Sequence, residues 1–227
     1  MPRSVLTDSE AFDLVKKVFE QIEKFHSIEE ITLLIRNVTG EKKFNNEEEK
    51  YPQITFSISK EEIKSIISSG KVKENYSLNQ ELGSTIIDPI TKLLYALAWK
   101  NGDLKKLKHI IKGIADSAEE ENDQDDALVF YHFGKHLTRQ TGQPIIDQHV
   151  LRSFELFKNK SSSPEKIRLN DKCTDKNLIA AYKKWWVEVV EKKINGNFDM
   201  AYKIDKLLFA VGKKIKLSKK NKVIEQI

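Results

Sequence analysis

The residue best suited to chemistry is Asp147, within the stretch Gly-Gln-Pro-Ile-Ile-Asp-Gln-His-Val-Leu-Arg at residues 142–152. Two isoleucines precede the carboxylate, and apolar residues at helical spacing follow it from Val150. An Asp just before a helix is most often its N-cap, whose carboxylate accepts a hydrogen bond from the first turn. A fixed carboxylate can also stabilise positive charge that develops in a reacting substrate. The sequence therefore leaves two roles open for Asp147, helix cap and catalytic group.

Other residue types that perform chemistry are sparse. His132 and His136 are four residues apart, a spacing that can hold a metal ion on one helix face. No glutamate lies between them and no third ligand is evident, so we expect surface or capping histidines and no metal site. The single Cys173 lies in a predicted loop without a nucleophile motif around it. No glycine-rich loop has the spacing that cradles phosphates, and no cofactor is expected.

Positive charge gathers at the C-terminal end of the chain. The formal charge is +5 overall, with 39 Lys and Arg against 34 Asp and Glu. Residues 183–227 hold twelve Lys and five acids, 12 − 5 = +7, which leaves 5 − 7 = −2 for the rest. A basic surface of this kind suits nucleic-acid phosphates, although a solvated helix face with a lysine-rich tail is the simpler explanation.

Composition indicates an all-α protein. The chain has 227 residues, 39% hydrophobic and 32% charged, with only nine Gly and five Pro to interrupt helices. No apolar run approaches the roughly 18 residues that a membrane span needs, so no membrane contact is expected. A single cysteine and the absence of a secretory signal pattern at the start favour a cytoplasmic location.

Apolar periodicity and capping residues place the helices. Thr7 and Glu10 have the spacing of a capping box, Ser59 and Glu62 repeat it, and Asp88-Pro89 is a typical helix start. The pattern predicts helices over residues 8–25, 28–39, 60–69, 89–100, 104–114, 127–140, 150–157, 178–194 and 198–215. It also predicts a short strand at residues 54–58, a polar connector at 71–84, and surface loops at 41–50, 119–126 and 161–176.

Two positions in these helices raise specific expectations. Gly113 lies inside a helix, where it costs about 1 kcal/mol relative to Ala, so it predicts close packing or an early helix end. Trp185 and Trp186 are adjacent and point about 100° apart on an α-helix. We therefore expect one of them in the core and the other partly exposed.

The stretch at residues 142–152 resembles a segment of the helix-hairpin-helix DNA glycosylases. In that superfamily a Gly-x-Pro turn leads through apolar residues to an Asp at the start of a helix, followed by x-His-Val-x-Arg. Looser similarity covers residues 99–113 and 204–213, and the first 75 residues have no counterpart. The family's hairpin normally reads Leu-Pro-Gly-x-Gly, where this chain has the acidic run Glu119 to Asp126.

The resemblance implies a two-lobed all-α fold with a cleft between the lobes. Residues 1–84 and 158–227 would form one lobe, and residues 85–157 would form the central part that ends in the Asp-bearing segment. It implies DNA as the partner and hydrolysis of a base's N-glycosidic bond, as in base excision repair. The family's iron-sulfur cysteines are missing, and no cofactor follows from it.

The resemblance also assigns roles to individual residues. Asp147 would be the catalytic carboxylate, with Lys135 and His149 as accessory groups. Contacts to DNA would come from the basic helices near the C-terminus, through Lys183, Lys184, Lys213, Lys214, Lys216 and the ring of Trp186. The alternatives are a catalytically silent DNA-binding relative and a helical protein-interaction domain in which Asp147 only caps its helix.

Overall fold

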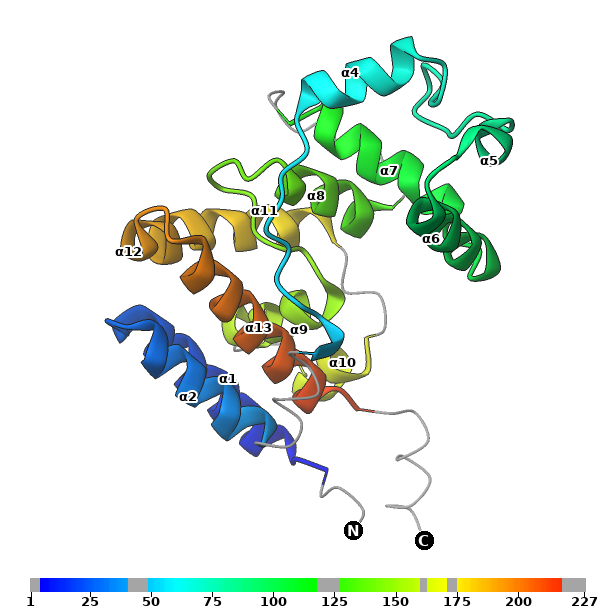
Figure 1. Ribbon diagram of the computed structural model, residues 1–227. Helices are drawn as coiled ribbons and strands as arrows, with labels where there is room; N and C mark the ends of the chain where they lie inside the picture. Colours follow the sequence, from blue (N-terminus) through cyan, green and yellow to red (C-terminus); the bar gives the residue numbers. More distant parts are fainter. Residues whose placement is uncertain (1–4, 41–48, 118–126, 160–162, 171–174, 218–227) are drawn as a thin grey trace, which may run out of the picture. The chain divides into compact units, whose positions relative to one another are not determined.

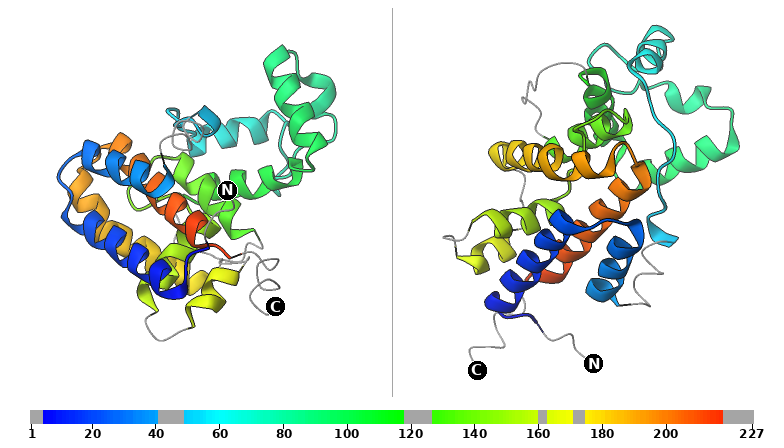
Figure 2. Two further views of the ribbon diagram at one scale, coloured as in Figure 1. Left: turned by 90° about the horizontal axis from the view of Figure 1, so that it is seen from below. Right: turned by 90° about the vertical axis from the view of Figure 1, so that its left-hand side faces the viewer.

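The computed structural model describes residues 5–40, 49–117, 127–159, 163–170 and 175–217, and these are mostly helical (Figures 1 and 2). Within these ranges there is no β-strand, only an isolated bridge between Val72 and Leu78. The expectation of an all-α chain is confirmed. No helix in this part of the chain is long and apolar enough to cross a bilayer. The acidic run Glu119 to Asp126, Cys173 and most of the charged loop 41–50 lie outside the described residues.

The chain divides into two compact units, residues 1–54 with 146–227 and residues 55–145. The first unit holds α1 (Asp8–Lys24), α2 (Ile28–Thr39), α9 (Gln148–Lys158), α10 (Pro164–Leu169), α11 (Lys176–Trp185), the π-helical stretch η1 (Trp186–Glu191), α12 (Lys192–Ile194) and α13 (Phe198–Ile215). The second holds α4 (Lys60–Ser68), α5 (Leu82–Thr85), α6 (Pro89–Lys100), α7 (Leu104–Ala115) and α8 (Leu128–Leu137). Thus residues 55–84, assigned from sequence to the N-terminal lobe, belong with the central helices. The Asp-bearing α9 belongs with the terminal ones.

The long helix α13 is the centre of the first unit. It lies between α2 and α9, and α1 packs against α9 (Figures 1 and 2). Apolar side chains along α13 are fully buried, among them Ile204, Leu207, Leu208, Val211 and Ile215. Two ends of the chain therefore share one core through a single helix.

Both adjacent tryptophans are buried, with 6% of Trp185 and 2% of Trp186 exposed. The expectation that one would be partly exposed is wrong. Trp185 lies against Phe19, with ring centroids 5.0 Å apart, and Trp186 lies 6.1 Å from the ring of Tyr182. The helix widens to a π-helix from Trp186 onward, so the simple α-helical angle does not apply there.

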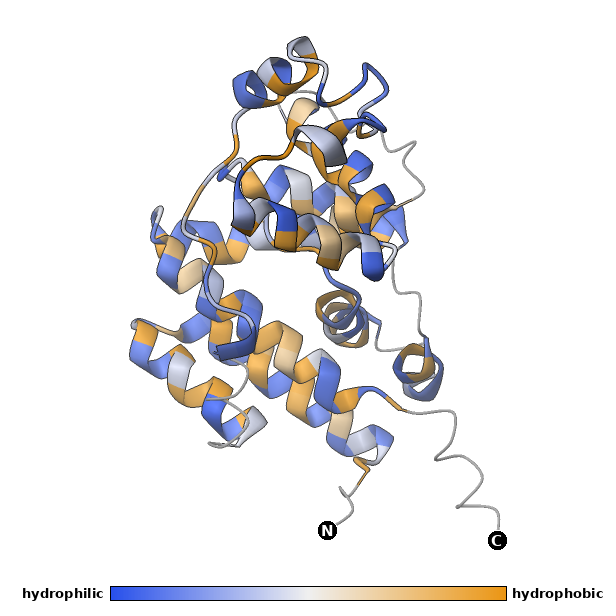
Figure 3. Ribbon diagram, turned by 45° about the vertical axis from the view of Figure 1, so that its right-hand side comes forward, coloured by the Kyte–Doolittle hydropathy of each residue, from blue (hydrophilic) through white to orange (hydrophobic). Residues whose placement is uncertain are grey.

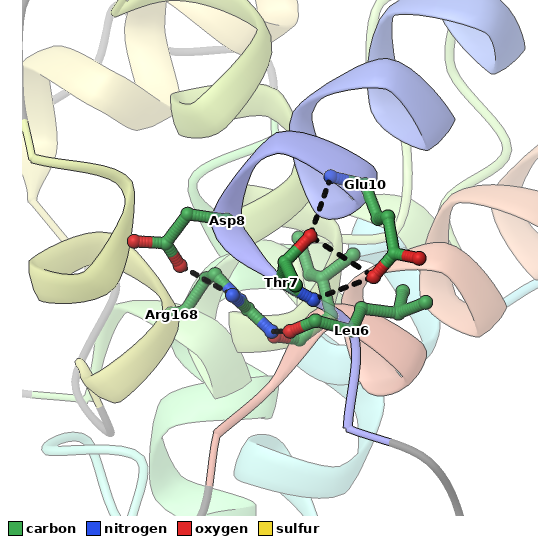
Figure 4. A network of polar contacts seen from close by, with 6 residues as sticks. Leu6, Thr7, Asp8, Glu10 and Arg168 are labelled. Atoms are coloured by element: carbon green, nitrogen blue, oxygen red, sulfur yellow. Dashed lines mark hydrogen bonds and ion pairs between the residues drawn. The ribbon is translucent and has the colours of Figure 1, made fainter.

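A buried arginine holds α10 in place. The sequence predicts a flexible loop over residues 161–176, but residues 164–169 form α10. The Arg168 guanidinium forms an ion pair with Asp8 and donates to the carbonyls of Leu6 and Ile215, the latter at 2.9 Å (Figure 4). A buried guanidinium needs such partners, and here they come from both ends of the chain. The loop prediction fails because these contacts act over long sequence distances.

The second unit is built on the pair α7 and α8, with α4 packed against α7. The segment predicted as a strand is extended but pairs with no other strand. Instead, the amide of Ile58 donates to the carbonyl of Leu137 at 3.0 Å, and the Arg139 Nε donates to the carbonyl of Phe56 at 3.4 Å. The extended segment is therefore bound to the end of α8 rather than to a sheet.

Two glycines allow α7 and α8 to touch through their backbones. A Cβ on Gly113 would lie 1.9 Å from the carbonyl oxygen of Tyr131, and a Cβ on Gly134 would lie 2.1 Å from that of Ile110. Both distances are impossible for real atoms. The expectation of close packing at Gly113 is confirmed, and Gly134 is its counterpart on the facing helix.

This packing can be tested by adding one methyl group. We expect Gly113→Ala to lower the free energy of unfolding by about 3 kcal/mol, the upper part of the usual range for overpacking, because backbone atoms must move to admit the Cβ. Gly83→Ala is the control, since its Cβ would lie 3.6 Å from the Tyr95 ring, an ordinary contact. Urea unfolding followed by circular dichroism measures both. Equal stability of the two variants would contradict the packing argument.

Candidate functional site

Asp147 is the N-cap of α9. Its backbone is extended, with φ −135° and ψ 148°, and its Oδ1 accepts a hydrogen bond of 2.6 Å from the amide of His149. Within the described part of the chain, the second oxygen, Oδ2, accepts no hydrogen bond. The residue is half-buried. The cap therefore uses one carboxylate oxygen and leaves the other for a further contact.

The imidazole of His149 is held on both sides. Its Nδ1 lies 2.8 Å from a terminal nitrogen of Arg152 and must accept there, because a guanidinium only donates. On its other side the ring lies edge-on to Phe209 of α13, with ring centroids 5.1 Å apart. Burial lowers the pKa of His149, the charges of Arg152 and Lys216 lower it further, and Asp147 opposes them. The contacts with Arg152 and Phe209 make His149 part of the packing between α9 and α13.

Arg152 is a residue of this site that the sequence analysis did not single out. Its side chain is fully buried, and its second terminal nitrogen donates to the carbonyl of Asn170 at 2.7 Å. The signal was an arginine among the buried positions of α9, between Leu151 and Phe154. A buried cation so close to a carboxylate-bearing helix start fixes the local geometry through hydrogen bonds.

The start of α9 lies directly on α13 at Gly212. A Cβ on Gly212 would lie 1.8 Å from the carbonyl oxygen of His149, so only glycine fits at this position of α13. Gly212 is a structural residue of this site that was not predicted from the sequence. A glycine within a long helix that has no break is the signal of such close approach.

Basic residues at the end of α13 reach the same place. The ring of Phe209 lies edge-on to His149 at 5.1 Å, and the Lys213 Nζ lies 5.6 Å from the centre of that ring. Lys216 is near enough to lower the pKa of His149. We call the set Asp147, His149, Arg152, Phe209, Lys213 and Lys216 the Asp147 cluster. It joins an acid with several cations on two packed helices.

The remaining lysines expected at DNA are placed elsewhere in the same unit. The Lys214 Nζ donates to the carbonyl of Val38 at 2.9 Å, at the C-terminal end of α2. Lys183 and Lys184 lie on α11, and Lys184 is 3.9 Å from Glu188 in an exposed pair. Trp186 is buried in the core, so its ring has no surface on which a base could stack.

The accessory lysine and the histidine pair lie on α8, in the other unit. Lys135 is only 1% exposed, and its Nζ lies 5.2 Å from the centre of the Tyr131 ring. His132 is also buried, so the expectation of a surface residue is wrong for it. The His136 Nδ1 donates to the carbonyl of Gln143 at 2.9 Å, which ties the following turn to the helix. Burial lowers the pKa of His136.

The described residues contain no group of three His, Cys, Asp or Glu that could hold a metal ion. A surface hollow lies along α9 between Phe154 and Asn159, facing Asp175 and Leu178 of α11. Asp147 does not line it. The groups at this site that can take part in chemistry are therefore the Asp147 carboxylate and its neighbouring cations.

The buried His149 predicts a dependence of stability on pH. Its pKa in the folded chain is below the value of about 6.5 expected when unfolded, so the unfolded chain binds the proton more readily. The stability it contributes is complete above about pH 6.5 and is lost as the pH falls through the lower folded value. We expect His149→Gln to reduce the loss of melting temperature between neutral and mildly acidic pH.

The control for this measurement is His26→Gln, which removes an exposed histidine. Calorimetric melting temperatures at matched ionic strength compare the three proteins. The wild type and His26→Gln should lose stability alike on acidification, and His149→Gln should lose less. Identical slopes for all three proteins would contradict the assignment.

No protein-family model, no curated protein and no solved structure matches this chain. The similarity of residues 142–152 to glycosylases of the helix-hairpin-helix superfamily therefore stays a prediction from sequence. The contacts of the Asp147 cluster are the structural evidence that bears on function.

Proposed function

We propose that this chain is a divergent DNA glycosylase-like protein that binds DNA, flips out a base and hydrolyses its N-glycosidic bond with Asp147. The single observation that carries the proposal is the state of that carboxylate. One oxygen caps α9 through the His149 amide at 2.6 Å, and within the described residues the other accepts no hydrogen bond. A fixed carboxylate with one free edge is what stabilisation of a sugar cation requires.

The proposed chemistry follows from the charge that develops on the sugar. As the bond from the anomeric carbon to the base nitrogen breaks, the base departs with the bonding electrons and the sugar gains oxocarbenium character. The negative oxygen of Asp147 stabilises that positive charge. Water then adds to the anomeric carbon, and the proton it loses is taken up by the departed base through solvent, leaving an abasic sugar and the free, neutral base. The base must leave the stack first, which costs a few kcal/mol.

The cations of the cluster supply the binding part of the proposal. Lys213 lies in the last turn of α13 and Lys216 is its C-cap, and α13 packs against the start of α9. Lysines at such positions neutralise the phosphates that flank a bound nucleotide. The buried Arg152 is not free to do so, because it is committed to His149 and Asn170. In this proposal Asp147 therefore stabilises the reacting sugar, and the two lysines bind phosphates of the DNA backbone.

Asp147→Asn separates chemistry from folding. Asn caps helices about as well as Asp, so this variant keeps its stability but loses the negative charge, whereas Asp147→Ala costs about 1 kcal/mol. We expect the wild type to release a base from at least one duplex in a panel with oxidised, deaminated or alkylated bases. Asp147→Asn should lower that rate by two orders of magnitude or more, as loss of a catalytic electrostatic group does.

The matched control is Asp175→Asn, which changes another N-cap of the same unit, the one that accepts from the Leu178 amide at 2.9 Å. It should release bases at the wild-type rate. The readout is strand cleavage at abasic sites after treatment with alkali. If the wild type binds the panel but releases no base, the catalytic proposal is lost and a silent DNA-binding protein remains.

Binding itself has a separate signature. If Lys213 and Lys216 contact phosphates, then replacing both with Gln should reduce the slope of log K against log salt by about 2 and weaken binding to all sequences alike. Lys16→Gln with Lys17→Gln removes the same charge from the surface of α1 and should change little. Duplex binding by fluorescence anisotropy measures both. A wild-type affinity independent of salt would leave only a protein-interaction role.

A further inference from the structure

The helix α6 is apolar and almost wholly exposed. None of its residues is buried. The large side chains Ile90, Leu93, Leu94, Leu97 and Trp99 are 59–68% exposed, and Ile87 just before the helix is 86% exposed. In Figure 3 orange, the colour of hydrophobic residues, recurs along α6. Soluble proteins rarely present so many large apolar side chains together unless another surface covers them.

Four of these side chains form a single stripe. Ile90, Leu93, Leu94 and Leu97 follow the spacing of one helix face, i, i+3, i+4 and i+7. The half-buried residues of α6, Tyr95 and Ala98, lie on a different side of the helix. Tyr95 there approaches Gly83 of α5. The stripe is therefore not the face by which α6 attaches to its own chain.

The helix is also well formed without cover. Asp88 accepts from the amide of Thr91 at 2.7 Å, Pro89 occupies the first helical position, and Lys100 lies in the last turn. These are favourable terminal residues for a helix. The exposed stripe thus belongs to a stable helix and can serve as a preformed surface.

We propose that α6 is a homodimer interface, in which the stripe packs against the same stripe of a second copy of this chain, antiparallel about a two-fold axis. The inference is independent of the proposed function. It rests first on the symmetry of the sequence pattern, because the spacing 3, 1, 3 reads the same in both directions. In the antiparallel pair Ile90 faces Leu97 of the partner subunit, and Leu93 faces Leu94 of the partner subunit. A two-fold interface requires this kind of self-complementarity.

Charge complementarity selects the same arrangement. The two-fold axis lies between positions 93 and 94, so the end of α6 that begins after Asp88 lies beside the end that carries Lys100 of the partner subunit. Both side chains are exposed. An antiparallel pair also sets the positive end of each helix dipole beside the negative end of the other. A parallel pair would place Asp88 beside Asp88 and Lys100 beside Lys100.

The available area fits a reversible dimer. With Ile87, the stripe exposes on the order of 600 Å² per copy, about 1,200 Å² for the pair, at the lower end of specific interfaces. Interfaces of that size without strong anchors bind weakly. We therefore expect association in the micromolar range.

The first test is the mass of the full chain in solution. At tens of micromolar, light scattering after size exclusion should give the wild type a mass approaching twice 26.3 kDa, falling on dilution. Leu93→Glu should remain at 26.3 kDa at every concentration, with unchanged circular dichroism because its side chain is exposed. Lys92→Gln, off the stripe with the same change in charge, should behave as the wild type. A wild type that stays at the single-chain mass overturns the proposal, whatever else α6 then binds.

The second test fixes the orientation by disulfide formation in a Cys173→Ser background. Leu94→Cys lies beside the axis and should cross-link to its own copy under mild oxidation. Ile90→Cys should not, since two such positions are seven residues apart along the helix, about 10 Å, beyond disulfide reach. A mixture of Ile90→Cys and Leu97→Cys chains should cross-link to each other. Equal self-linking by all three variants would indicate a parallel pair and overturn the arrangement.

Discussion

The contact of Gly212 with the carbonyl of His149 is the constraint on which the first unit depends. α13 touches α9 there through backbone atoms alone, since an added Cβ would lie 1.8 Å from that oxygen. The close approach brings the imidazole of His149 against Phe209 and within reach of the charges of Lys216 and Asp147. A larger residue at 212 would separate the two helices and with them the acid from the cations. The site is therefore a consequence of how two helices cross.

The second unit uses the same device twice. Gly113 and Gly134 each face a carbonyl of the opposite helix, those of Tyr131 and Ile110. Close backbone approach leaves little room for water and fixes the register of the two helices, because a shift by one residue would bring a Cβ against a carbonyl. The α7–α8 pair is therefore fixed mainly by the close contact of the two backbones at these glycines, and less by the amount of apolar surface it buries.

Sequence patterns predicted the helices well because local rules govern them. The capping box at Thr7 and the N-cap roles of Asp88 and Asp147 depend on neighbours within three residues, and all three form. Predictions failed where contacts with residues far away in the sequence determine the local structure or the burial of a side chain. Arg168 turns an apparent loop into α10 through partners some 160 positions away, and the adjacent Trp185 and Trp186 are both buried, with Trp185 against Phe19. The Gly212 contact was missed for the same reason, although the rule applied to Gly113 would have found it.

Capping and catalysis at Asp147 are compatible because they use different atoms. The cap requires an oxygen that accepts from the His149 amide, and the proposed chemistry requires a negative oxygen facing the substrate. A carboxylate has two oxygens that share one charge, so the bond at Oδ1 orients the group without consuming Oδ2. An amide in its place keeps the first property and loses the second. This is why stability and base release should separate at this residue, and why the usual helix-cap explanation for such an Asp does not argue against a role in catalysis.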